Sequence, residues 1–140
     1  MLYVGTPFLV GDGSVGAIRL AESAGLAPKG ATPAEKLKDI QGILATGDKR
    51  AAAIFESIGC YLGYAIAHYS DFYDIRHVLL LGRVTSGDGG DIVIRRATEV
   101  LQGEFPELSS KVKIHVPEEE SERRVGQAIA AASLPAIPKK

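Results

Sequence analysis

The stretch HVLLLGRVTSGDGG, residues 77–90, decides the fold. Residues 77–81 form a short continuous apolar run, which is typical of a strand covered on both faces in a largely parallel sheet. A polar, glycine-rich stretch follows at 82–90. Beyond it, apolar residues recur at helical spacing, at Ile92, Val93, Ala97, Val100 and Leu101. The pattern therefore predicts a strand, a loop and a helix in succession, as in α/β folds.

The flanking sequence predicts further helices and few strands. We expect helices at 14–24, 33–45, 49–71 and 121–133, a half-buried strand at 111–116 and an uncertain strand at 2–10. The helix at 33–45 has the clearest start, because Thr32 can cap it, Pro33 suits its first position and Glu35 completes a capping box. Two strands are few for a stable sheet. The sheet is therefore completed in one of three ways: by the strand at 2–10, by strands from a partner chain, or by further strands of a larger protein.

The longest predicted helix, 49–71, carries Gly59 and Gly63 on its surface. Each glycine costs up to about 1 kcal/mol relative to alanine in an exposed helix. We therefore expect another helix or a sheet to pack closely against this face, rather than a ligand.

The composition indicates one domain, 1–140, of ordinary globular character. Of its 140 residues, 46% are hydrophobic and 24% charged. The formal net charge of −1 argues against direct nucleic-acid binding, because no excess of cations is present. No apolar run approaches the roughly 20 residues that span a membrane, and no leader opens the chain, so we expect a soluble, cytoplasmic protein. The single Cys60 and three widely spaced histidines predict no metal site.

The glycine-rich stretch after residue 81 is the best candidate for a binding site, because ligands of open α/β sheets collect where strands end and helices begin. Glycines there allow close approach of the backbone, hydroxyl groups and an arginine can contact phosphate, and the set suits a nucleotide. An ordinary solvent-exposed turn explains the same composition equally well. The candidate ligand-binding residues are Gly82, Arg83, Thr85, Ser86, Gly87, Gly89 and Gly90.

A second glycine motif, GDGSVG at 11–16, has the spacing of a dinucleotide-binding loop. Such a loop requires a second strand after its helix, with an acidic residue about 20 positions further on. The sequence at that place, LAPKGATPAEKLKD, predicts a loop and another helix instead. Binding of NAD is therefore a weak alternative.

The region from about 47 to 134 resembles the closing part of the ROK family (repressor, open reading frame, kinase), which comprises bacterial sugar kinases and sugar-responsive repressors. Three stretches carry the resemblance: the helix beginning TGDKRAAAIF and running into YLGYAIA, the strand IRHVLLLG, and the helix RVGQAIAAA. The resemblance implies an α/β fold, the RNase H-like C-terminal lobe of the actin-like ATPases, with a short, mostly parallel sheet flanked by helices. It divides the chain into an N-terminal segment, 1–46, and a lobe, 47–134.

The resemblance also implies that the loop after the central strand closes on ATP or ADP with Mg²⁺. Arg83 stands where the family usually has the second glycine of a pair, and this side chain either blocks a phosphate or holds one. The family's catalytic aspartate, sugar-binding residues and first phosphate loop have no counterpart in 1–46, and its cysteine-rich zinc motif is absent. No catalytic residue is therefore assigned.

Two main functions follow from the resemblance. The chain is a nucleotide-binding lobe that cannot phosphorylate a sugar alone and meets its sugar only through a missing N-terminal lobe. Alternatively, it is a regulatory or interaction domain without catalytic activity, as in the family's transcriptional regulators. Both lead us to expect a homodimer or a partner chain, because an incomplete fold leaves apolar surface exposed.

Overall fold

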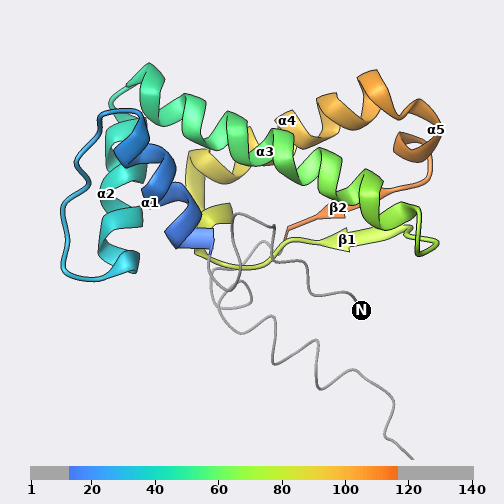
Figure 1. Cartoon of the computed structure of the whole chain (residues 1–140), viewed down its shortest axis with the longest axis horizontal. Coiled ribbons are helices and arrows are strands. Elements are labelled where there is room, and N and C mark those ends of the chain that lie inside the picture. Colours follow the sequence, from blue (N-terminus) through green and yellow to red (C-terminus); the bar gives the residue numbers. More distant parts are fainter. Residues whose placement is uncertain (1–12, 117–140) are drawn as a thin grey trace, which may run out of the picture.

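The computed structural model describes residues 13–116, and helices dominate them (Figure 1). The predicted strand at 2–10 and the predicted helix at 121–133 lie outside the described residues. In chain order the elements are α1 (Gly13–Ser23), α2 (Pro33–Ala45), α3 (Lys49–Ser70), β1 (His77–Leu79), the short 3-10 helix η1 (Arg83–Thr85), α4 (Gly87–Glu104), α5 (Pro106–Ser109) and β2 (Lys113–His115).

Local capping chemistry sets the ends of the first helices. After α1, Gly25 adopts a φ of 77°, the amide of Leu26 donates to the carbonyl of Ala21, and that of Gly25 donates to Glu22, which together form a Schellman motif. At the start of α2, Thr32 and Glu35 form the predicted capping box. The bounds of α2 agree with the prediction, and α2 follows α1 without an intervening strand. The order of elements after GDGSVG is therefore not that of a dinucleotide-binding unit.

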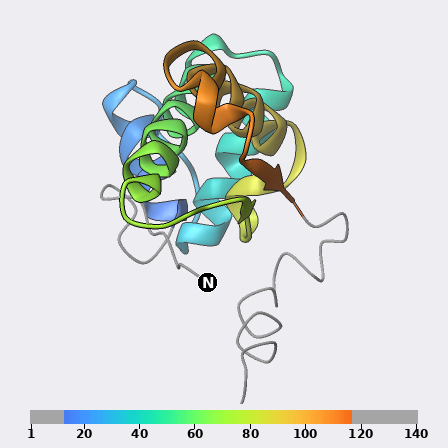
Figure 2. The same ribbon diagram turned by 90° about the vertical axis from the view of Figure 1, so that its right-hand side faces the viewer.

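Helices α3 and α4 pack side by side along the length of the molecule, and this pair contains much of the core (Figures 1 and 2). Gly59 and Gly63 lie at the contact, as predicted. A Cβ atom on Gly59 would lie 2.6 Å from the carbonyl oxygen of Val93, and one on Gly63 would lie 2.8 Å from the Cβ of Val100. The two glycines thus allow the backbones to approach closely.

Strands β1 and β2 form a two-stranded parallel sheet, in which His77 pairs with Lys113 and Leu79 with His115. The helices lie on one side of the strands (Figures 1 and 2). Val78 and Ile114 pack against the core, whereas the residues on either side of them are exposed. Among residues 13–116, helices cover one face of this strand, and the second covered face that the sequence predicts is not found. The apolar run continues beyond the three paired residues.

The loop after β1 is also shorter than predicted, because α4 begins at Gly87 rather than after residue 90. Gly87, Gly89 and Gly90 belong to the first turn of α4, and the loop between β1 and α4 contains η1. The described residues thus form a helix-rich α/β arrangement with a small parallel sheet. Within residues 13–116, none of the helices has the length and apolar character needed to span a lipid bilayer.

Candidate functional site

The candidate site lies where the chain leaves β1 and enters α4. Gly82 has a φ of 107° and Gly87 a φ of 63°, both in the region that favours glycine. No atom would lie within 4 Å of a Cβ on either residue, so the requirement for glycine there comes from backbone conformation. With these two glycines the chain turns from the end of β1 into the first residue of α4.

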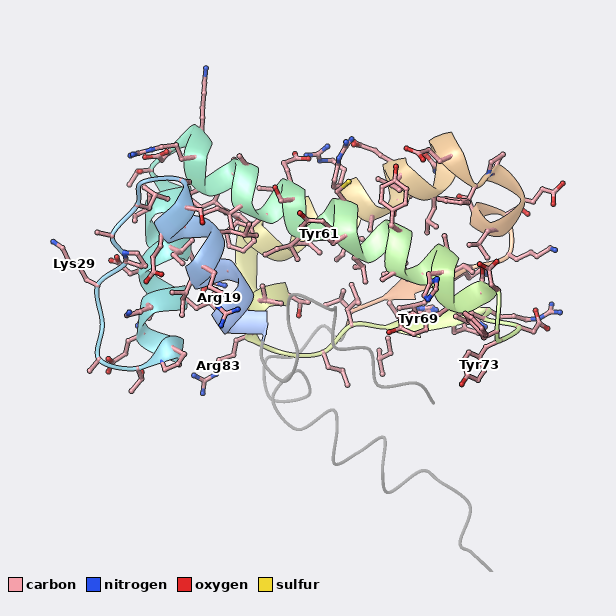
Figure 3. All side chains as sticks on the ribbon, in the orientation of Figure 1. Arg19, Lys29, Tyr61, Tyr69, Tyr73 and Arg83 are labelled. Atoms are coloured by element: carbon pink, nitrogen blue, oxygen red, sulfur yellow. The ribbon has the colours of Figure 1, made fainter. Side chains whose placement is uncertain are left out.

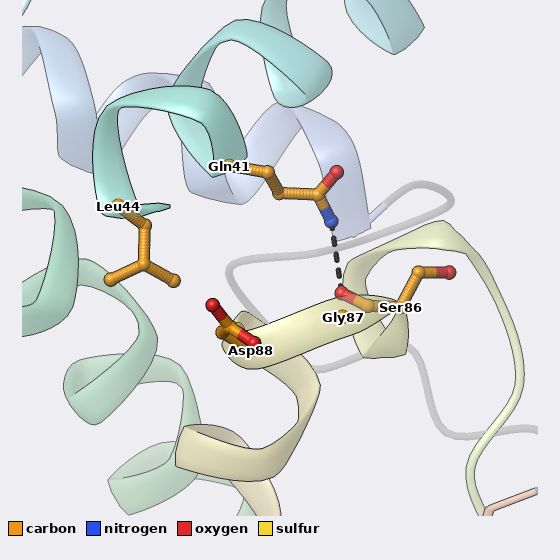
Figure 4. Close-up of a pocket in the computed structure, with 6 residues that line it drawn as sticks. Gln41, Leu44, Ser86, Gly87 and Asp88 are labelled. Carbon is orange, nitrogen blue, oxygen red and sulfur yellow. Dashed lines mark hydrogen bonds between the residues drawn. The ribbon is translucent and has the colours of Figure 1, made fainter. Parts of the chain in front are cut away.

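Gln41 of α2 holds this turn in place. Its Nε2 atom donates to the carbonyl oxygens of Arg83 and Ser86, at 3.2 Å in each case, and Figure 4 shows the second of these bonds. The turn is therefore fixed by a side chain from a helix more than 40 positions earlier in the sequence. Sequence reasoning missed Gln41, because a glutamine within an amphipathic helix carries no local signal of a distant partner.

An open pocket of about 340 Å³ lies between the end of α2 and the first turn of α4. Figure 4 shows Gln41 and Leu44 on its α2 side and Ser86, Gly87 and Asp88 opposite them. Ser86 occupies the N-cap position of α4, but its side chain makes no capping hydrogen bond. The first amide groups of an α-helix lack partners within the helix and carry a partial positive charge. This end of α4 can therefore bind an anion. The described residues lining the pocket are Gln41, Leu44, Ser86, Gly87, Asp88 and Gly89.

Three of the seven predicted ligand-binding residues line this pocket: Ser86, Gly87 and Gly89. Gly89 is also buried against α3, where a Cβ atom would lie 2.5 Å from the ring of Phe55. Gly89 therefore packs against α3 and also lines the pocket.

Three of the other four predicted residues, Gly82, Thr85 and Gly90, have contacts within the turn that explain them. The Thr85 hydroxyl donates to the carbonyl oxygen of Gly82 at 2.7 Å, and Thr85 is buried. A Cβ on Gly90 would overlap the carbonyl oxygen of Thr85. The absence of a side chain at Gly90 therefore lets the backbone of α4 approach the backbone of η1 closely. These contacts stabilise the turn and do not themselves indicate a ligand.

Arg83 lies on η1 outside the pocket lining and is exposed. Figure 3 shows its side chain projecting away from α3 and α4, on the same side of the molecule as Arg19. Among residues 13–116 it forms no salt bridge. In this arrangement Arg83 neither blocks the pocket nor contacts a phosphate within it.

Asp88 is the ionisable side chain among the described lining residues, and it is exposed. Its carboxylate opposes the binding of a bare anion but suits a divalent cation such as Mg²⁺, which prefers oxygen ligands. A single carboxylate with amide groups supports ligand binding. It does not provide the acid, base and nucleophile that a chemical reaction requires.

A cluster of charged side chains links α3 and α4 on the outer surface, away from the lining residues. Arg95 pairs with Glu56 and Glu99, and Arg96 pairs with the same two carboxylates. Hydrogen bonds from Arg95 and then Arg96 lower the pKa of Glu99 below its ordinary value. Exposed pairs of this kind contribute little stability each, so the pairs with Glu56, which link α3 and α4, add little to the packing of the two helices.

Comparisons with known proteins give no relative for this site. The chain matches no model of a protein family, no curated protein and no solved structure. The resemblance to the ROK family therefore stays a prediction from the residues that carry it.

Proposed function

We propose that this chain is a nucleotide-binding lobe similar to the C-terminal lobe of the ROK sugar kinases, and that it does not phosphorylate sugars by itself. The observation that carries the proposal is the first turn of α4, which lacks a side-chain cap and opens onto a pocket of about 340 Å³. A phosphate group is the anion that helix N-termini of this kind commonly bind. The resemblance of the surrounding strand and helices to the ROK pattern supports a nucleotide as its source.

The lining residues divide into parts that suit different portions of such a ligand. The amides at the start of α4 suit the phosphates, and Leu44 provides an apolar wall. Asp88 suits a Mg²⁺ ion accompanying the phosphates, and that ion would neutralise part of their charge. Gln41 holds the turn through its two hydrogen bonds, so the amide groups are already oriented before a ligand arrives.

Calorimetric titration with ADP tests the proposal, first in the presence of EDTA and then with Mg²⁺. Without metal, Asp88→Asn should bind ADP more tightly than the natural chain, by about fivefold, because one nearby like charge contributes roughly 1 kcal/mol in water. With Mg²⁺ present, the same substitution should weaken binding. Asp91→Asn is the matched control, since Asp91 is exposed on the same helix and does not line the pocket. Absence of ADP binding, or equal effects of the two substitutions, would refute the assigned site.

The second half of the proposal concerns catalysis. A mixture of the chain, glucose and ATP with Mg²⁺ should show no formation of ADP above that of a blank, because the chain lacks counterparts of the family's catalytic and sugar-binding residues. A coupled spectrophotometric assay measures this directly. Measurable turnover by the purified chain would contradict it.

A second candidate function, an interaction domain, is favoured by exposed apolar side chains near β1. Phe72 and Tyr73 in the turn after α3, and Leu79 in β1, are 69%, 54% and 53% exposed. Figure 3 shows Tyr73 at the outer edge of this end of the molecule. Sedimentation velocity tests this function: the chain should dimerise, Leu79→Lys should weaken the dimer, and Ala53→Lys on the exposed side of α3 should not. A monomer at every concentration would count against it.

A further inference from the structure

The parallel pairing of β1 and β2 brings two histidines together on the exposed face of the sheet. The Nδ1 atom of His77 lies 2.9 Å from the Nε2 atom of His115, and the ring centroids are 5.2 Å apart. Both residues are exposed. Because 38 positions separate them in the sequence, their proximity depends on the register of the two strands.

The two imidazoles lie close enough to become ligands of one metal ion. Nitrogens bound to one ion at the usual distance of about 2.0–2.1 Å lie about 2.9 Å apart at a right angle and about 3.4 Å apart at a tetrahedral angle. The 2.9 Å separation between His77 Nδ1 and His115 Nε2 is that of a hydrogen bond between two rings whose nitrogens face each other. Because both side chains are exposed, rotation of the rings reaches either arrangement without a change in strand register.

We propose that His77 and His115 together bind one divalent late transition-metal ion, with Cu²⁺ bound most tightly. Imidazole nitrogen suits these ions, and affinity for a given nitrogen site peaks at Cu²⁺ along the first-row series. Water occupies the remaining positions, since no group of three or more His, Cys, Asp or Glu side chains that could hold a metal is found among the described residues. The site is independent of the nucleotide pocket and of its proposed function.

Binding requires a small rearrangement of the two rings. Without metal, one ring donates a hydrogen bond to the other, so one of the two facing nitrogens carries a proton. When the ion binds, that ring transfers the proton through solvent to its other nitrogen, and both facing nitrogens then offer lone pairs. Exposure of the rings permits the rotation that directs these lone pairs towards one point.

The test uses the full chain prepared without a polyhistidine tag and titrated with Cu²⁺ or Ni²⁺ by calorimetry. One ion should bind per chain. Each of His77→Gln and His115→Gln should weaken binding by at least about tenfold, because each leaves a single imidazole and removes the gain from a second, intramolecular ligand. His68→Gln is the matched control, since His68 is the third histidine of the chain and lies on α3.

Electron paramagnetic resonance of the Cu²⁺-loaded natural chain gives a second readout that needs no variant. Its nitrogen splittings should indicate two equivalent imidazoles on one ion. The proposal would be overturned by a spectrum with one imidazole, by an unchanged affinity after either glutamine substitution, or by an equal loss of affinity in His68→Gln. Circular dichroism of each variant confirms that the fold is retained, and the spectrum of the natural chain decides the question if a variant fails to fold.

Discussion

Substitution of Gly59 by alanine tests the close packing of α3 against α4. In an exposed helix this change stabilises a protein by up to about 1 kcal/mol, because alanine has the higher helix propensity. Here the new Cβ would lie 2.6 Å from both the Cβ of Arg96 and the carbonyl oxygen of Val93. A backbone oxygen within a helix cannot move aside alone, so α3 and α4 must separate along their shared face.

Overpacking of this kind costs about 1–3 kcal/mol. After allowance for the gain in propensity, Gly59→Ala should lower the free energy of unfolding by up to about 2 kcal/mol. Gly42→Ala is the matched control, because Gly42 is helical and exposed and its added Cβ would meet no atom within 4 Å. The control should raise the free energy of unfolding by up to about 1 kcal/mol.

Urea denaturation followed by circular dichroism measures both substitutions. Thermal denaturation gives a second measure, since 1 kcal/mol shifts Tm by about 3–6 °C in a domain near this size. The two variants should move in opposite directions. If Gly59→Ala stabilised the chain as much as Gly42→Ala, the helices would not be in the contact described, and the reasoning would be refuted.

Two further predictions concern helix ends and pH. Thr32→Ala should lower the free energy of unfolding by about 1 kcal/mol through loss of the capping hydrogen bond, whereas an unchanged urea midpoint would show that the cap contributes nothing. The backbone amides of Ala31 and then Thr32 lower the pKa of Glu35 below its ordinary 4.5, and the side chain of Arg50 lowers that of Asp48 below 3.8. Because the folded pKa values are depressed, their stabilisation is complete above these ordinary values and is lost as pH falls through the folded ones. Tm should therefore decline on acidification below about pH 4.5, and Glu35→Gln should reduce the decline; an identical acid profile for the variant would contradict this assignment.

Local chemistry made some elements predictable from the sequence. The start of α2 follows from Thr32, Pro33 and Glu35, whose capping roles involve only neighbouring residues. The glycines on α3 predicted close packing by another helix or a sheet, since nothing local compensates for their low helix propensity. The nature of the partner, α4, could not be read from α3 alone.

The start of α4 shows why the candidate site was only partly predictable. Ser86 and the glycines after it have turn composition, so the sequence indicates a loop through residue 90. In the structure Gly89 accommodates the ring of Phe55, and Gly90 accommodates the carbonyl of Thr85. These long-range contacts override the low helix propensity, and they also remove Gly90 from the ligand-binding set.

Other features depend entirely on how distant segments pair. The apolar run at 77–81 contains no signal that, within residues 13–116, helices cover one face of β1. The contact of His77 with His115 depends on the register of β1 and β2, and Gln41 meets the β1–α4 turn through the packing of α2. Single-sequence patterns do not encode such pairings.

The measurement that most directly tests the proposed nucleotide site is the change in backbone amide NMR shifts when ADP is added to the full chain. The account predicts shifts concentrated at Gly87, Asp88 and Gly89, with smaller ones at Gln41 and Leu44. The backbone amides of Arg83 and Arg19, neither of which lines the pocket, should change little. Absence of shifts in the first turn of α4, or shifts centred on the two arginines, would contradict the central claim.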